Sequence, residues 1–91
     1  SLKPENYGLG QNYPNPFNPS TKLQYSVKEA DKVNIAVYDV LGRLVTTLVD
    51  EYKPAGTYEV KFDAGRLTSG VYFYTMTVNG FRESRKMILN K

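Results

Sequence analysis

Apolar and polar residues alternate with a period of two over much of this chain. Leu23, Tyr25 and Val27, for example, are separated by a glutamine and a serine and flanked by two lysines. Such alternation puts successive side chains on opposite faces of an extended strand, so it predicts strands with one buried face. The strands predicted in this way span residues 22–28, 33–38, 43–49, 58–62, 71–78 and 81–89.

Turns that contain glycine separate these strands. Asn79-Gly80 is a strong signal for a two-residue hairpin. The turns recur roughly every 8–12 residues, and no helical period extends beyond a turn or two. The pattern therefore predicts an antiparallel β-sandwich of six strands, with a seventh if the residues before 13 also pair. Because each lies in or beside a turn, four glycines are expected to be structural residues: Gly42, Gly56, Gly70 and Gly80.

Two of the predicted strands depart from simple alternation. The pattern is irregular over residues 43–49, which predicts a β-bulge or an edge position. Residues 71–78 begin with apolar side chains on both faces and are rich in β-formers, as is typical of a central strand.

A proline-rich segment precedes the first predicted strand. Pro14, Pro16 and Pro19 fall within six residues, with Asn15 and Phe17 between them. Each proline fixes φ and pushes the residue before it to an extended conformation, so the segment is stiff. We expect it to form a rigid collar in which Phe17 plugs one end of the sandwich. The alternative is a polyproline ligand, although residues 16–19 give its one PxxP spacing.

The composition excludes several kinds of chemistry. The chain has 91 residues, enough for one small domain, and contains neither cysteine nor histidine. Disulfides, thiolate metal sites and the usual general base are thereby excluded. The acidic pairs Glu29/Asp31 and Asp50/Glu51 fall in predicted turns and are expected to be solvated rather than to bind calcium. We expect no enzymatic activity, no cofactor, no metal site and no nucleic-acid partner.

No apolar run approaches the length of a membrane span, and no signal peptide is visible. We therefore expect no membrane-spanning segment, and we expect the chain to be a piece of a longer secreted protein.

Eight tyrosines suggest a possible binding surface. Exposed tyrosines on a sandwich can stack on sugars, so a carbohydrate-binding module is one interpretation. The other is that Tyr25, Tyr58, Tyr72 and Tyr74 pack in the core with their hydroxyls at its rim.

The net charge of +3 comes entirely from the last eleven residues, because residues 1–80 hold eight basic and eight acidic side chains. Two interpretations stay open at this point. The excess charge attracts an anionic or translocon partner, or it protects an edge strand from aggregation.

Five separated sequence blocks resemble a known family. The chain resembles the type A C-terminal sorting domain of the type IX secretion system of Gram-negative bacteria over about residues 10–91. The family commonly has tryptophan where this chain has Phe62. The Ig-like module of the flagellar hook-cap scaffolding protein is similar in two of these segments. The blocks are QNYPNPFNPST at 11–21, VYDVLGRLV at 37–45, AGTYEVKFDA at 55–64, LTSGVYFYTM at 67–76 and RKMILNK at 85–91.

The resemblance implies an Ig-like β-sandwich of about seven strands that acts without catalysis. Such a domain takes its N-terminal cargo from the periplasm through the outer-membrane machinery, and a sortase-like transpeptidase then removes it at the cell surface. On this basis residues 1–12 form a linker or lead-in and residues 13–91 the sorting domain. A carbohydrate- or surface-binding module and a structural spacer remain the alternatives.

The resemblance also places recognition on the last strand. An edge strand with free backbone groups can pair with a strand of a receptor, and basic side chains can steer the encounter. The candidate residues are Arg82, Arg85, Lys86, Met87, Ile88, Leu89 and Lys91.

Overall fold

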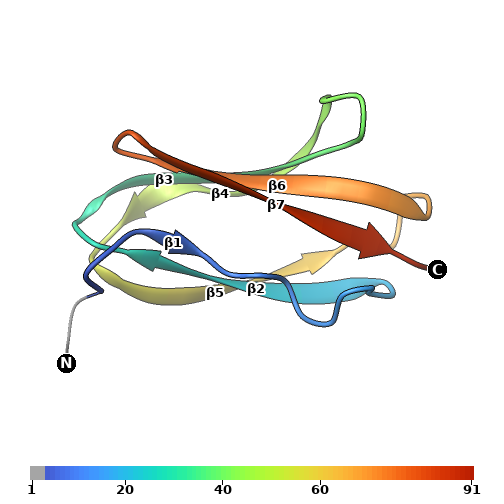
Figure 1. Cartoon of the computed structure of the whole chain (residues 1–91), viewed down its shortest axis with the longest axis horizontal. Coiled ribbons are helices and arrows are strands. Elements are labelled where there is room, and N and C mark those ends of the chain that lie inside the picture. Colours follow the sequence, from blue (N-terminus) through green and yellow to red (C-terminus); the bar gives the residue numbers. More distant parts are fainter. Residues whose placement is uncertain (1–3) are drawn as a thin grey trace.

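The computed structural model describes residues 4–91 and contains seven strands (Figure 1). Part of the predicted linker, residues 1–3, lies outside the described residues. Within residues 4–91 there is no helix, so no helix of membrane-spanning length is present. The strands are β1 (Gly8–Leu9), β2 (Ser20–Val27), β3 (Asp31–Tyr38), β4 (Leu44–Lys53), β5 (Gly56–Asp63), β6 (Gly70–Val78) and β7 (Phe81–Leu89).

The strands form two antiparallel sheets packed face to face. One sheet has three strands in the order β1-β2-β5, and the other has four in the order β4-β3-β6-β7. The first, second and fifth strands lie opposite the others, as in Ig-like sandwiches, but β4 pairs with β3 here, whereas the fourth strand of a constant-type Ig domain lies beside the fifth. The predicted all-β antiparallel sandwich of about seven strands is confirmed, and the seventh strand comes from the lead-in.

The core consists of the side chains that the alternating pattern directs inward from both sheets. In β2, for instance, Leu23, Tyr25 and Val27 are buried while Lys22 and Gln24 are exposed. Phe17 and Phe62 meet at one end of the core, with ring centroids 6.1 Å apart. The largest fully buried side chains are Tyr74, Phe17, Leu23, Ile35, Met76, Met87, Leu89, Val27, Val33, Val37, Val78 and Thr21.

The strand predicted at residues 43–49, which is β4 in the structure, has both features that its irregular pattern predicted. β4 is an edge strand, and its pairing with β3 shifts register between Ile35 and Ala36 and again between Val37 and Tyr38. It also runs on to Lys53, beyond the end predicted at residue 49, because Asp50 to Lys53 continue the ladder opposite Asp31 to Asn34. β6 lies between β3 and β7, as expected of a central strand.

Two turns use backbone conformations that require glycine. Gly80 has φ of 82° in the hairpin that joins β6 to β7, and Asn79 beside it has φ of 43°. Gly42 has φ of 81°, and its N–H donates to the carbonyl of Asp39 at 3.0 Å. A side chain at either glycine is strained, so these turns depend on the residue type.

Tyr72 forms a corner that is typical of Ig-like sandwiches. Its hydroxyl donates to the carbonyl of Thr68, four residues upstream at the entry to β6, at 2.8 Å. A tyrosine near the start of this strand that bonds back to the preceding loop fixes the crossing between the sheets. Tyr72 therefore has a structural role here.

The lead-in is part of the sandwich from Tyr7 onward. Gly8 and Leu9 pair with Ser26 and Tyr25 of β2. Leu9 is 3% exposed and Asn12 is 2% exposed, so both side chains lie in the interior. A run of two paired residues is too short to produce a visible period of two, which is why the sequence pattern gave no strand here.

Candidate functional site

The last strand, β7, contains most of the residues expected to be recognised, and its side chains divide between two faces. Met87 and Leu89 are 0% and 1% exposed, so their side chains belong to the core. Arg82 and Lys86 point to solvent on the outer face, and Ile88 is half-buried. On the folded domain, only the outward-facing residues of this strand are therefore accessible to a partner.

The backbone edge of β7 is covered over its second half. The N–H of Phe17 donates to the carbonyl of Ile88 at 2.9 Å, and the N–H of Asn90 donates to the carbonyl of Phe17 at 3.0 Å. The Ile88 N–H donates to Oδ1 of Asn15 at 2.9 Å, and Nε2 of Gln11 donates to the carbonyl of Lys86 at 2.9 Å. From Lys86 to Asn90 these outward-facing backbone groups are thus already bonded to the chain's own N-terminal part.

The first half of β7 holds the lead-in through side chains. The N–H of Leu9 donates to Oε1 of Glu83 at 3.2 Å, and Nε of Arg85 donates to the Leu9 carbonyl at 2.5 Å. Nη2 of Arg85 is also 3.0 Å from Oε2 of Glu83. Arg85 is therefore a structural residue that fastens β1, and its charge is partly neutralised.

Lys91 is also engaged within the domain. Its Nζ donates to the carbonyls of Gly65 and Leu67 at 2.6 and 2.7 Å, and its N–H donates to Oγ of Ser69 at 3.0 Å. The ammonium group thus joins the end of the chain to the loop between β5 and β6.

A buried hydrogen-bond network holds the lead-in to the core. The Tyr74 hydroxyl, on a side chain that is 0% exposed, accepts from the N–H of Asn12 at 2.8 Å and donates to the carbonyl of Gly10 at 2.7 Å. Nδ2 of Asn12 donates to Oγ1 of Thr21 at 3.0 Å. Thr21 in turn donates to the carbonyl of Pro14 at 2.9 Å. Burial raises the pKa of Tyr74, because the phenolate loses solvation there.

The proline-rich segment lies against this network with one side chain buried. Phe17 is 2% exposed, while Pro14, Pro16 and Pro19 are exposed on the surface. Residues 7–17 together, which we call the covering segment, thus bridge from β2 in one sheet to β7 in the other. The position of Phe17 is the one that the collar interpretation requires.

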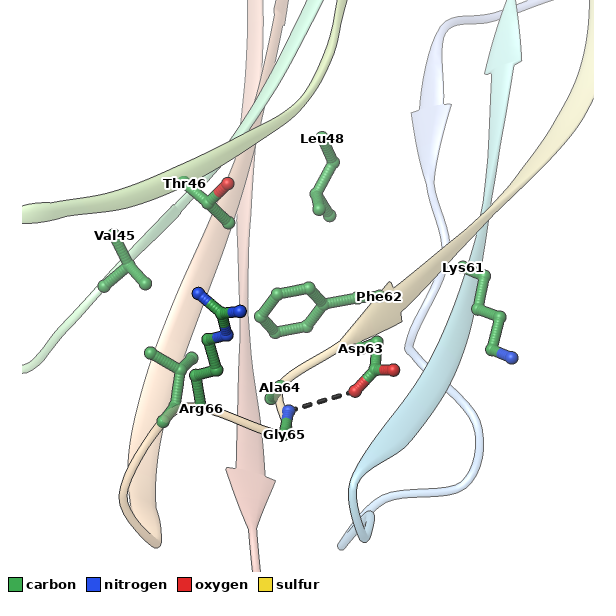
Figure 2. Close-up of a pocket in the computed structure, with 10 residues that line it drawn as sticks. Val45, Thr46, Leu48, Lys61, Phe62, Asp63, Ala64, Gly65 and Arg66 are labelled. Atoms are coloured by element: carbon green, nitrogen blue, oxygen red, sulfur yellow. Dashed lines mark hydrogen bonds between the residues drawn. The ribbon is translucent and has the colours of Figure 1, made fainter.

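On the opposite side, the sandwich is open. β5 ends one sheet and β4 ends the other, and a cleft of about 630 Å³ lies between them (Figure 2). Phe62 points into this cleft with Leu48 above it, and the Arg66 side chain extends alongside the ring. The pattern of apolar residues did not reveal this cleft, since it depends on which strands end each sheet.

The comparisons with known proteins identify the family. A model of the secretion system C-terminal sorting domain matches residues 11–90. The chain belongs to this family. The match begins at Gln11, within the covering segment, and ends one residue before Lys91, so it spans the whole sandwich apart from β1. Neither the curated proteins nor the solved structures contain a match.

Membership in the sorting domain family gives the function in outline. A domain of this kind is a C-terminal signal for type IX secretion, so it is attached to a cargo and interacts with the secretion machinery. The cargo is thereby directed across the outer membrane to the exterior or the cell surface. Among residues 4–91, no group of three or more histidine, cysteine, aspartate or glutamate side chains is arranged to hold a metal ion.

The four strand tyrosines that were expected to pack in the core of this sorting domain lie in or against it, while Tyr13 and Tyr52 are exposed. Tyr25, Tyr72 and Tyr74 are buried, and Tyr58 is half-buried and stacks on Tyr25 with centroids 5.3 Å apart. This agrees with the interpretation that they pack in the core. The hydroxyl of Tyr58 donates to the carbonyl of Pro54 at 2.6 Å, which places it at the rim.

The turn before β4 presents apolar side chains to solvent. Val40, Leu41 and Leu44 are 66%, 73% and 60% exposed. Asp39 holds the turn, since its Oδ1 accepts from the N–H groups of Leu41 and Arg43. The hydrogen bonds from the Arg43 N–H, the Arg43 guanidinium and the Leu41 N–H lower the pKa of Asp39. They outweigh partial desolvation, which raises it.

Proposed function

We propose that this domain acts as a folded, non-catalytic export signal that is removed once its cargo reaches the cell surface. The observation that carries the proposal is the family match over residues 11–90 of a chain that closes into one sandwich. A cargo fused before residue 1 crosses from the periplasm through the outer-membrane machinery, which reads the domain in its folded state.

The internal bonding of both chain ends supports recognition of a folded signal. Residues 7–17 are held by backbone and side-chain bonds to β2, β6 and β7, and Lys91 is bonded to the loop between β5 and β6. Residues 7–17 and Lys91 are therefore not free to act as an unfolded tag, which supports a signal read from the surface of the folded domain.

Among the candidate residues of β7, we propose that Arg82 and Lys86 provide the steering charge. Both are exposed, and neither forms an ion pair within the described residues. Exposed cations without partners add most to the rate of encounter with an acidic surface. Arg85 and Lys91, by contrast, are engaged within the domain, and Met87 and Leu89 help to hold it together.

We further propose that a sortase-like transpeptidase cleaves the chain ahead of Tyr7. Glu5 and Asn6 are exposed and precede the first paired residue, Gly8. Proteases need extended backbone that is not hydrogen-bonded in a sheet, which the segment before Gly8 offers more readily than the sandwich.

The test is an export assay in a bacterium that has the type IX machinery. A fluorescent reporter is fused before residue 1 of this chain and compared with the reporter alone, each with the same periplasmic signal peptide. We expect the fusion at the cell surface and the reporter alone in the periplasm. Equal retention of both in the periplasm contradicts the proposal.

A variant with Arg82→Gln and Lys86→Gln tests the steering charge in the same assay. Its matched control is Lys28→Gln with Lys32→Gln, which removes two exposed lysines at the connection between β2 and β3. We expect slower surface appearance of the β7 variant only, and unchanged melting temperatures. Identical export of both variants contradicts the steering role.

A further inference from the structure

The two sheets differ in width, and this leaves one strand without a facing neighbour. Three strands lie opposite four, and the covering segment occupies the side where β2 and β7 meet. At the other side, β4 extends over the cleft beside β5. Its side chains Val45, Thr46 and Leu48 line that cleft together with Phe62 (Figure 2). One more strand beside β5 would give each sheet four strands.

The outer edge of β5 has backbone groups available for such a strand. The N–H of Ala64 donates to the carbonyl of Pro19 on the β2 side at 2.8 Å. Bonded residues alternate in an antiparallel ladder, so the N–H and C=O groups of Lys61 and Asp63 face away from β2. Within residues 4–91, no backbone bond outside the ladders joins this edge to β4.

The charges beside the cleft indicate what kind of strand fits. Lys61 and Arg66 are exposed and form no ion pair within residues 4–91. The one carboxylate that lines the cleft, Asp63, uses Oδ1 to accept from the N–H of Gly65 at 3.0 Å. A strand of alternating apolar and acidic residues matches the apolar floor and these two cations.

From these observations, and resting on the proposed sorting function, we infer that the secretion machinery recognises the domain by strand addition at β5. An extended segment of the machinery pairs with the backbone of Lys61 and Asp63. Its apolar side chains enter the cleft against Phe62 and Leu48, and its carboxylates meet Lys61 and Arg66. Main-chain pairing supplies the affinity in this binding mode, and the side-chain pockets supply the specificity.

Lys61→Pro in the reporter fusion tests the pairing. Proline removes the outward N–H and blocks a paired strand, yet it is tolerated at an edge whose N–H faces solvent. The control is Ser84→Pro, which removes an outward N–H from β7, the other candidate edge, together with the 2.7 Å bond between Oγ of Ser84 and Oγ1 of Thr75. Because one lost bond and the clash of the ring weaken pairing, we expect about a tenfold loss of surface export for Lys61→Pro. Ser84→Pro is expected to stay within about twofold of the unchanged fusion, by the additivity of distant sites.

The outcomes separate this inference from the sorting function. Export of Lys61→Pro at the unchanged rate overturns strand addition at β5, and loss for Ser84→Pro alone moves recognition to β7. If the unchanged fusion is not exported at all, the sorting function itself fails. If Lys61→Pro does not fold, the pair Lys61→Glu with Arg66→Glu replaces it, with Lys28→Glu and Lys32→Glu as control. Export equal to that control overturns the inference.

A second copy of the chain is the remaining occupant to exclude. Two β5 edges can pair with each other, so the molar mass of the isolated domain is measured by light scattering over a range of concentrations. We expect a monomer. A dimer that Lys61→Pro dissociates would assign this edge to self-association and overturn the inference.

Discussion

The gap between the two sheets is closed on one side of the sandwich and left open on the other. On the side of β2 and β7, the covering segment, which includes the edge strand β1, bonds to both of these strands and fills the interior with Phe17. Where β5 and β4 end their sheets, a cleft of about 630 Å³ remains and apolar side chains line it. The comparison shows that the chain uses its proline-rich segment to seal one side, while the other stays available for contact.

Loss of the Phe17 ring, on the closed side, is expected to destabilise the domain most. Phe17→Ala leaves a cavity on the closed side and should lower the free energy of unfolding by about 3–5 kcal/mol. Urea unfolding of the purified domain measures it. Tyr13→Ala is the control, because Tyr13 lies in the same segment and is 81% exposed. A Phe17→Ala variant as stable as Tyr13→Ala would show that the collar does not stabilise the sandwich.

Tyr74→Phe tests the polar part of the same seal. Removal of the hydroxyl leaves the Asn12 N–H and the Gly10 carbonyl without their partner. Buried groups left unpaired typically cost about 1–3 kcal/mol, and that is the expected destabilisation. Tyr72→Phe serves as a comparison, since its hydroxyl bonds to the carbonyl of Thr68 in the loop that enters β6 and not to the lead-in. A Tyr74→Phe domain that unfolds at the unchanged urea midpoint would contradict the network.

The raised pKa of Tyr74 predicts alkaline sensitivity. A tyrosine whose folded-state pKa exceeds the unfolded value of about 10 stabilises the fold below that pH, and the contribution is lost as pH rises through the folded pKa. Burial is the main cause at Tyr74, and also at Tyr25. Stability should therefore fall above about pH 10, and less steeply in Tyr74→Phe. Parallel pH profiles of the two domains would refute the assignment to Tyr74.

Arg85→Ala is expected to have a smaller effect on the closed side. It removes the donor to the Leu9 carbonyl and frees Glu83. One partly exposed bond contributes about 0.5–1.5 kcal/mol, and hydrogen exchange at Leu9 should rise accordingly. Lys86→Ala, one residue away and exposed, should leave both measurements unchanged. Equal results for the two variants would mean that Arg85 does not fasten β1.

The smallest loss of stability is expected for a substitution on the open side, at the cleft. Leu48 is half-buried at the cleft, so Leu48→Thr should cost less than about 1 kcal/mol. The same change at Leu23, which is 1% exposed, should cost several times more. Thermal unfolding of both variants measures the difference. A large loss at Leu48 would indicate that the cleft is closed in solution.

The sequence predicted those parts of the fold that depend on residues close to one another along the chain. The period of two located β2 and β3, and Asn79-Gly80 located the hairpin between β6 and β7. The burial of Phe17 was also expected, on the interpretation that the stiff proline-rich segment is a collar in which Phe17 plugs one end of the sandwich.

The rest depended on contacts between distant residues, which periodicity does not report. The last strand was expected to offer a free edge, yet residues 11–17 bond to it from Lys86 to Asn90. The division of sheets into three and four strands, and with it the open cleft, also requires the pairing order. Arg85 and Lys91 looked like surface charges because their partners, Leu9 and Gly65, are far away in sequence.

The pairing of Phe17 with Leu89 has a mechanical consequence. The two backbones run parallel there, and the described chain before β1 lies at the opposite end of the domain from the end of β7 (Figure 1). A pull that draws the ends apart slides these two backbones past each other along their length. The two bonds that Phe17 makes to Ile88 and Asn90 then carry the load together instead of opening one after another. Tension between these two backbones is therefore borne in shear by both bonds at once.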